Sequence, residues 1–263
     1  MPPDNSASTS SEKIMNASLS ISDDPADIGA MRQQIAAATR MLVMEEILDY
    51  SGHVSARMPD GDTFMVQNAS DSRGELEPDR LLVMDLDGRV VAGNEKPPLE
   101  TVLHAEIFRA RPDVQAILHC HLELAISFTL MKNVGLVPVR SRAVRWRSGI
   151  PTHPDPSLIR RKEQGESLAA TLGHHNAALL RSHGMVLVAE SVPALYIDAL
   201  HFKANARAQM SVLQAGQTLV PMTEAEMDMI DSPREFHIAK LWNFYVRKAR
   251  ASRIIPSDWS ATL

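Results

Sequence analysis

The sequence lacks the features that mark secreted, nucleic-acid-binding and membrane-spanning proteins. One cysteine in 263 residues excludes an intramolecular disulfide framework, which favours a cytoplasmic location. The formal net charge is −5, and although residues 140–147 are locally basic, no excess of lysine and arginine indicates a nucleic-acid partner. No apolar run approaches the roughly 18 residues of a membrane-spanning helix, so we expect no membrane partner.

The amino-terminal segment carries no targeting pattern. Residues 1–24 are polar and rich in serine, with no basic stretch followed by an apolar one, so we expect no secretory signal. This composition predicts a disordered tail over residues 1–24, because it cannot bury enough apolar surface to fold. The whole chain is 44% hydrophobic and 22% charged, as in ordinary globular proteins, and we expect one domain over residues 25–263.

Hydrophobic periodicity alternates between helical and extended patterns along this domain. Residues 24–52 have the helical pattern, with Asp24 or Asp27 as a candidate cap and Gly52 as the expected end. Two pairs of short extended runs each flank an Asp-Gly turn, as in β-hairpins. Helices are expected in residues 99–114, 166–173, 192–216 and 232–251, a strand passing into a helix in 115–131, and two strands in 176–191. Hairpins with flanking helices predict an α/β fold, layered α/β/α.

The run "AILHCHLELA", residues 116–125, places two histidines around the single cysteine in an otherwise apolar segment. On a strand, His119 and His121 would point to the same face, because side chains alternate with a period of two. Two adjacent imidazoles can chelate a divalent metal, and the alternative is a pair of satisfied core histidines. Cys120 would point to the opposite face and pack there.

Two further residues are candidates for the same site. His183 lies between apolar runs in "LLRSHGMVLV", and the glycine after it permits a tight turn or close approach, so it is either a third ligand or a turn histidine. Glu100 stands where a helix begins after two prolines. A carboxylate there either carries chemistry or only favours the positive end of the helix dipole. The other seven histidines, His104 among them, have weaker contexts.

In combination, these motifs resemble the class II aldolase/adducin family. The resemblance covers almost all of residues 25–255 and rests on "GHVSAR", "LEPDRLLVMDLDGRVVAG", "PPLETVLHAEIFRARPDVQAILHCH" and "ALLRSHGMVLVAES", in this order. It implies a three-layer α/β/α domain with a mainly antiparallel central sheet. It also implies a homotetramer with the active site, for a small-molecule substrate, at a subunit interface.

The resemblance also implies roles for the residues singled out above. His119, His121 and His183 would be the three ligands of a divalent metal, and Glu100 would be the acid/base glutamate beside it. Three imidazoles suit Zn, Mn, Fe, Co or Ni, so the identity of the metal stays open. The three histidines argue against a non-catalytic, adducin-like scaffold.

The substrate class follows from where the chain departs from the family's aldolases. Those enzymes bind a substrate phosphate with Gly-Asn in the first hairpin and Ser-Ser before the glutamate. Here the positions read Gly52-His53 and Pro98-Leu99, and proline lacks an N–H while leucine lacks a hydroxyl. A sugar phosphate is therefore disfavoured.

The remaining motifs resemble the family's decarboxylase branch. "EQGESLAATLG", "ANARAQ" and "LWNFYVRKAR" are similar to members that act on hydroxylated aromatic carboxylates, such as a dihydroxyphthalate, or on carboxylated ring-fission products. A metal would take up the charge that develops as CO₂ leaves. The alternatives are an aldolase, epimerase or dehydratase of a small hydroxycarbonyl compound, and a non-haem iron oxygenase.

Substrate contacts are expected from three further residues. A second carboxylate would pair with arginine, and Arg142 is our candidate in the basic segment, although a solvated loop is the alternative. His53 and Ser70 replace or adjoin the family's phosphate-binding loops. For protonation of the product carbon, Glu100 is the first candidate, and a tyrosine, Tyr196 or Tyr245, is the second.

Overall fold

The structure, a computed structural model, describes residues 24–230 and 233–261. The tail expected over residues 1–24 therefore lies outside the described residues, except for Asp24. This residue belongs to the folded part, because its Oδ1 accepts a 2.9 Å hydrogen bond from the backbone N–H of Ala26 and caps the first helix.

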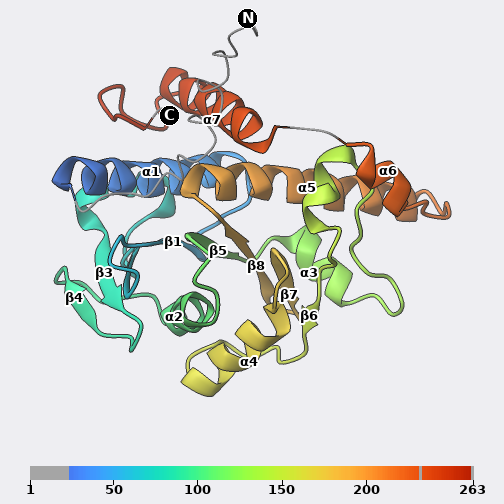
Figure 1. The fold of residues 1–263 in the computed structure, drawn as a ribbon, viewed down its shortest axis with the longest axis horizontal. Coiled ribbons are helices and arrows are strands. Elements are labelled where there is room, and N and C mark those ends of the chain that lie inside the picture. Colours follow the sequence, from blue (N-terminus) through green and yellow to red (C-terminus); the bar gives the residue numbers. More distant parts are fainter. Residues whose placement is uncertain (1–23, 231–232, 262–263) are drawn as a thin grey trace, which may run out of the picture.

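An eight-stranded sheet runs through the centre of the described chain (Figure 1). Its strands are β1 (His53–Arg57), β2 (Thr63–Val66), β3 (Leu82–Asp85), β4 (Val90–Ala92), β5 (Ala116–Cys120), β6 (Thr152–His153), β7 (Ala177–Leu180) and β8 (Gly184–Ala189). Their spatial order is β4-β3-β2-β1-β5-β8-β7-β6, and every neighbouring pair is antiparallel except β6 with β7. The mainly antiparallel sheet and both hairpins are confirmed.

Helices cover the two faces of the sheet. In the described ranges they are α1 (Pro25–Met44), α2 (Thr101–Ala110), α3 (Glu123–Thr129), α4 (Lys162–Leu172), α5 (Val192–Gln214), α6 (Glu224–Asp228) and α7 (Arg234–Ala251). One hydrophobic core joins the sheet to α1, α3, α5 and α7, and a second joins its other face to α2 and α4 (Figure 1). The fold is therefore the expected α/β/α arrangement.

β5 shows how the central strands serve both cores. All five of its residues are buried, because helices cover both faces. Leu118 and Cys120 pack in the core beneath α1 and α5, whereas Ile117 packs in the core with α2 and α4. The alternation confirms that Cys120 points away from the face that carries His119.

One local expectation was wrong. The first helix ends at Met44 rather than at Gly52, because Glu46 adopts a left-handed φ of 53° and the N–H of Ile47 bonds back to the carbonyl of Leu42. This Schellman turn sends the following apolar residues into the core. In the basic segment, Ser141–Trp146 forms a 3₁₀ helix.

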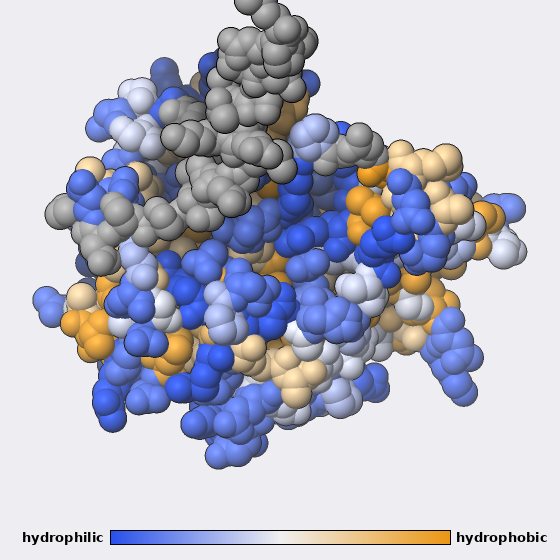
Figure 2. Space-filling model, in the orientation of Figure 1, coloured by the Kyte–Doolittle hydropathy of each residue, from blue (hydrophilic) through white to orange (hydrophobic). Residues whose placement is uncertain are grey.

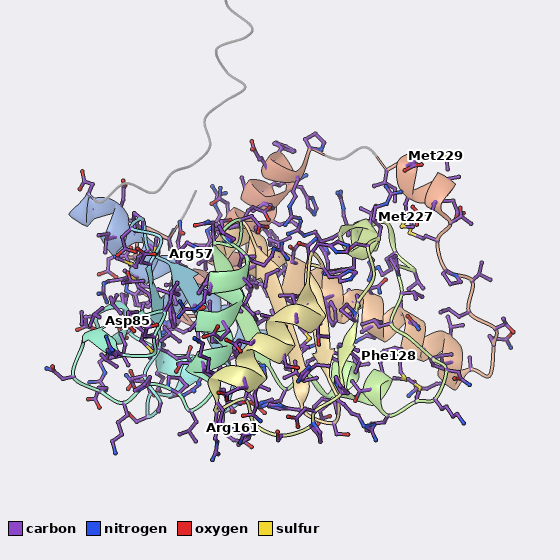
Figure 3. The ribbon with its side chains drawn as sticks, turned by 60° about the horizontal axis from the view of Figure 1, so that its bottom comes forward. Arg57, Asp85, Phe128, Arg161, Met227 and Met229 are labelled. Atoms are coloured by element: carbon purple, nitrogen blue, oxygen red, sulfur yellow. The ribbon has the colours of Figure 1, made fainter. Side chains whose placement is uncertain are left out.

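Arg57, the last residue of β1, ties the first hairpin to the carboxyl end of α2. Its guanidinium donates to the carbonyls of Phe108 (2.6 Å), Arg111 (3.1 Å), Val114 (3.0 Å) and Gly61 (2.6 Å). Figure 3 shows Arg57 on the same side of the molecule as α2. A cation beside these carbonyls also complements the negative end of the helix dipole.

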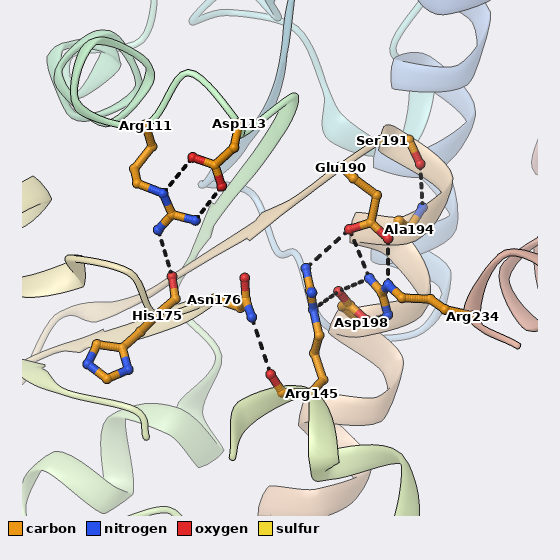
Figure 4. A network of polar contacts seen from close by, with 10 residues as sticks. All are labelled: Arg111, Asp113, Arg145, His175, Asn176, Glu190, Ser191, Ala194, Asp198 and Arg234. Carbon is orange, nitrogen blue, oxygen red and sulfur yellow. Dashed lines mark hydrogen bonds and ion pairs between the residues drawn. The ribbon is translucent and has the colours of Figure 1, made fainter. Parts of the chain in front are cut away.

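A second polar network attaches α7 to the start of α5. Arg234 reaches Glu190 at 2.5 Å and Asp198 at 2.8 Å, and Arg145 of the 3₁₀ helix also bonds Asp198 at 3.1 Å (Figure 4). Asp198 is buried, so the two guanidinium groups supply partners that water cannot.

The surface in Figure 2 is mostly hydrophilic, with hydrophobic side chains gathered around α6. Val220 and Met229, which lie just before and just after α6 in the chain, are 84% and 75% exposed. Within the described residues, no helix combines the length and apolar character needed to cross a lipid bilayer.

Candidate metal centre

Three histidines converge at one end of the central strands. β5 lies beside β8, and the register pairs Cys120 with Met185. His121 follows directly after β5 and His183 stands directly before β8, so antiparallel pairing brings both to the end that carries His119. The ring centroid of His119 lies 5.0 Å from that of His121 and 5.1 Å from that of His183. The structure thus brings the predicted triad together.

Two glycines allow the backbone to close around these rings. A Cβ on Gly184 would lie 2.4 Å from a backbone carbonyl oxygen of β5 and 3.1 Å from Cδ2 of His121. Gly52 has a φ of +84°, and a Cβ there would lie 2.7 Å from the carbonyl oxygen of His119. The glycine that follows His183 is therefore needed for close approach, which is one of the two roles expected for it.

The ring nitrogens of the triad fit a divalent metal. Nδ1 of His119 lies 3.0 Å from the carbonyl oxygen of Met185, so it carries the hydrogen and leaves Nε2 with a free lone pair. Nε2 of His119, of His121 and of His183 is buried without a hydrogen-bond partner in the described chain. Buried nitrogens without partners are unfavourable unless a ligand completes them. With Glu100, these residues offer four donor atoms within 4.8 Å of one another.

His121 is held in the neutral form that binds metals. Burial, together with the neighbouring His119 and His183, lowers its pKa to about 4. Burial likewise places the pKa of His104 at about 3 and that of His53 well below its ordinary value. Metal ligation needs a deprotonated nitrogen, so no proton has to leave the ring of His121 at neutral pH.

Glu100 lies against two of the histidines as a carboxylate. Its Oε2 lies 3.5 Å from Nε2 of His119, its Oε1 lies 3.5 Å from Nε2 of His183, and Oε1 accepts a 2.8 Å hydrogen bond from the N–H of Ile159. Burial alone would raise the pKa of this carboxyl group, but the interactions with His119 and His183 outweigh it and hold the pKa far below the ordinary value. Glu100 can therefore serve as a fourth ligand or as a base.

A hydrogen-bonded array beside the triad was missed by the sequence reasoning. Nδ1 of His53 lies 2.6 Å from Nε2 of His104, whose Nδ1 lies 2.6 Å from Oγ of Ser55. The ring of His53 lies 5.3 Å from that of His119, its partner in the β1–β5 register. The signal was present, because His104 follows Glu100 by one helical turn and Ser55 follows His53 by one strand repeat.

Arg73 was also missed. Its guanidinium is buried and donates to three backbone carbonyls, those of Gly52 (3.2 Å), Ala69 (3.3 Å) and Asp71 (2.7 Å). Its positive charge contributes to the low pKa of His53, so its field reaches the site. Its place in a polar loop gave no sequence pattern by which to find it.

The other predicted contacts lie outside the four-residue cluster. Ser70 is exposed, and both its N–H and its hydroxyl bond Oδ1 of Asn68 at 3.0 Å. Arg142 stands in the 3₁₀ helix, where its charge helps to lower the pKa of His201 and of His237. Neither is among the residues that the described chain gathers around the triad, and their contact with a substrate stays a prediction.

Both candidate tyrosines lie between α5 and α7. Tyr196 is fully buried, with its ring centroid 5.6 Å from that of Trp242 and 5.5 Å from that of Tyr245. Burial raises the pKa of Tyr196 above its ordinary value. Tyr196 therefore acts as a packing residue, and Tyr245 is covered in part by Lys248, whose Nζ lies 5.5 Å from the ring centre.

Comparisons with known proteins agree on the family. The model of the Class II Aldolase and Adducin N-terminal domain matches residues 33–210. A 3,4-dihydroxyphthalate decarboxylase of Rhodococcus jostii is 29% identical over 240 residues, which cover 85% of this chain and 97% of that protein. A methylthioribulose-1-phosphate dehydratase of Gluconacetobacter diazotrophicus is 34% identical over 112 residues, covering 43% of this chain and 54% of that protein.

Solved structures agree on the fold. An aldolase II superfamily protein from Pseudomonas syringae superposes with a TM-score of 0.74 at 24% identity, covering 86% of this chain and 94% of that one. The family match spans more than half of the sequence and includes Glu100 and all three histidines of the cluster. The chain belongs to the class II aldolase and adducin family.

Proposed function

We propose that this protein is a metal-dependent carboxy-lyase that acts on a small hydroxylated aromatic carboxylate of the dihydroxyphthalate type. The observation that carries the proposal is the set of three buried imidazole nitrogens without partners, beside an ionised carboxylate. The match to a dihydroxyphthalate decarboxylase over nearly its whole length supports the substrate class.

The metal would be held by His119, His121 and His183, with Glu100 as the fourth donor in the resting site. When bound, it supplies a Lewis acid that takes up the negative charge left when CO₂ departs. Zn, Mn, Fe, Co and Ni all suit three imidazoles and one carboxylate.

Glu100 would accept a proton from the substrate and return it to the product carbon. Its carboxylate is ionised at rest, so it accepts a proton from the phenolic hydroxyl of the incoming substrate. It then returns that proton to the ring carbon as the bond to the carboxyl group breaks. The hydrogen bond from the N–H of Ile159 to Oε1 holds the carboxyl group in place.

The walls of the site favour a carboxylate over a phosphate ester. Leu99 is 69% exposed and Pro98 has no N–H, so the segment before Glu100 offers an apolar surface to an aromatic ring rather than donors to a phosphate. Arg73, His53 and, from the basic segment, Arg142 would recognise the substrate's anionic oxygens.

The active unit would be a cytoplasmic homotetramer whose active sites lie at subunit interfaces. Large apolar side chains are exposed next to the site, with Leu99 beside Glu100 and Tyr50, 89% exposed, close before His53. Exposed apolar residues at the rim of a site are suited to cover by a neighbouring subunit.

A dehydratase or aldolase is the second candidate, favoured by the dehydratase relative with 34% identity over part of the chain. The same donors would stabilise an enediolate. The two are separated by their products, because decarboxylation releases CO₂, aldol cleavage gives two carbonyl fragments, and dehydration gives neither.

The test is a panel of dihydroxyphthalates, hydroxybenzoates and hydroxycarbonyl compounds, incubated with the metal-loaded protein. We expect CO₂ and the matching phenol in equal amounts from at least one aromatic dicarboxylate. Turnover of only the hydroxycarbonyl compounds would replace the proposal with the second candidate, and O₂ consumption would indicate an oxygenase instead.

A further inference from the structure

Ser55 and His104, which form a hydrogen-bonded array with His53, have no role in the chemistry above. All three side chains are buried, with 0%, 0% and 4% exposure, and both ring nitrogens of His104 are engaged. Both contacts are short, at 2.6 Å, so each nitrogen or oxygen faces one partner within the described chain.

The two hydrogen bonds of this array can be oriented in only two ways. If His104 donated from Nδ1 to Ser55, the buried hydroxyl hydrogen would have no acceptor within the described residues, which is unfavourable. If the hydroxyl of Ser55 donates to Nδ1 of His104, then Nε2–H of His104 donates to Nδ1 of His53, and the hydrogens of Ser55 and His104 both have acceptors. His53 then carries its own hydrogen on Nε2.

We propose that Ser55 and His104 are positioning residues that fix His53 in its Nε2–H tautomer, which makes His53 a hydrogen-bond donor to an anionic oxygen of the ligand beside the triad. The ring of His53 lies 5.3 Å from that of His119, so its donor stands next to the metal ligands. The nature of that ligand rests on the proposed function, whereas the tautomer does not.

The same tautomer keeps His53 out of the metal's ligand set. A histidine binds a metal through a nitrogen that carries no hydrogen, and Nε2–H has no lone pair to offer. This explains why His53 lies beside the triad but is not part of the metal-binding cluster. That cluster combines the donor atoms of the three triad histidines with those of Glu100. A neutral donor next to the metal favours ligands with a carboxylate or phenolate oxygen at that point.

The array does not act as a proton relay. If His53 released its Nε2 hydrogen and the array shifted in concert, the proton would come from Ser55 and leave an alkoxide in a fully buried position. A buried unpaired anion is strongly disfavoured. The hydroxyl of Ser55 therefore fixes the direction of the hydrogen bonds in the array and does not supply a proton to the ligand.

The first test is the tautomer itself, read from two-bond ¹H–¹⁵N correlations of protein labelled with ¹⁵N-histidine and loaded with Zn²⁺. His53 is assigned by comparison with His53→Gln. We expect the Nε2–H pattern for His53 in the wild type. The Nδ1–H tautomer, or a doubly protonated ring, would overturn the proposal.

The second test removes the terminal hydroxyl. Ser55→Ala should leave the zinc content at the wild-type level, give mixed tautomers of His53, and lower kcat/KM about tenfold through KM. Ser55→Thr keeps a hydroxyl and should restore the single tautomer. An unchanged tautomer in Ser55→Ala would show that Ser55 does not set it.

These results separate the inference from the proposed function. If the tautomer is Nε2–H and responds to Ser55→Ala but no substrate in the panel releases CO₂, the decarboxylase proposal fails and the tautomer lock stands. If CO₂ is released and the tautomer is the opposite one, the lock fails alone.

Discussion

Gly184 lies between His183, a proposed metal ligand, and the rest of β8. In Gly184→Ala, the new Cβ would lie 2.4 Å from a backbone carbonyl oxygen and 3.1 Å from Cδ2 of His121. Real Cβ atoms essentially never come within 3.0 Å of such atoms, so the end of β5 that carries this carbonyl must move away by about 0.6 Å or more, and His121 follows it directly. Ligand positions tolerate only about 0.2 Å, so the shift should displace His121 from the metal.

We expect Gly184→Ala to bind zinc at least about tenfold more weakly than the wild type and to lose about 1–3 kcal/mol of stability. The assay is competition with a chromogenic chelator, with denaturant unfolding of the metal-free protein alongside. Gly135→Ala is the matched control, because a Cβ there meets nothing within 4 Å. Wild-type zinc affinity in Gly184→Ala would refute the claim that glycine is needed for the close approach.

Three further predictions test other parts of the account. Arg57→Ala removes four hydrogen bonds to backbone carbonyls and should lower the free energy of unfolding by about 2–4 kcal/mol in a urea titration, whereas the exposed Arg89→Ala should change it by less than about 0.5 kcal/mol. Glu100→Gln should keep the three-histidine metal content but lower kcat more than about 100-fold, and retention of activity would exclude Glu100 as the proton carrier. The pKa of Glu190 is held below 4.5, because the hydrogen bonds from Arg234 outweigh the burial that would raise it. The ion pair therefore stabilises the fold above that pH, and this stabilisation is lost as the pH falls through the lowered pKa. The melting temperatures of wild type and Glu190→Gln should therefore differ at pH 7 and converge on acidification, and a gap that widens at low pH would contradict this sign.

The parts of the fold that local patterns control were predictable from the sequence. Asp-Gly turns set both hairpins, and the alternation in "AILHCHLELA" correctly separated Cys120 from His119. The end of α1 was missed because a glutamate, Glu46, takes the left-handed position that glycine usually fills. The chain turns at Glu46 because the apolar residues that follow, Ile47 and Leu48, become buried when it does.

The site was predictable only where its residues share an element or a motif. His119 and His121 are one strand repeat apart, and His183 was marked by its apolar flanks and the glycine that follows. His104 and Arg73 escaped notice, because their importance arises from strands and loops brought together by folding: His104 meets β1 across the face of the sheet. The spacing of His104 from Glu100 and of Ser55 from His53 places each pair on one face of its own element, but it does not show that the two elements meet.

The central claim is that the three histidines hold a metal, and the most direct test is elemental analysis. The wild type, His121→Ala and the exposed-histidine control His174→Ala are purified without added metal, then reconstituted and desalted. We predict about one divalent ion per chain in the wild type and in His174→Ala, and almost none in His121→Ala. An empty wild type after reconstitution, or undiminished metal in His121→Ala, would contradict the account.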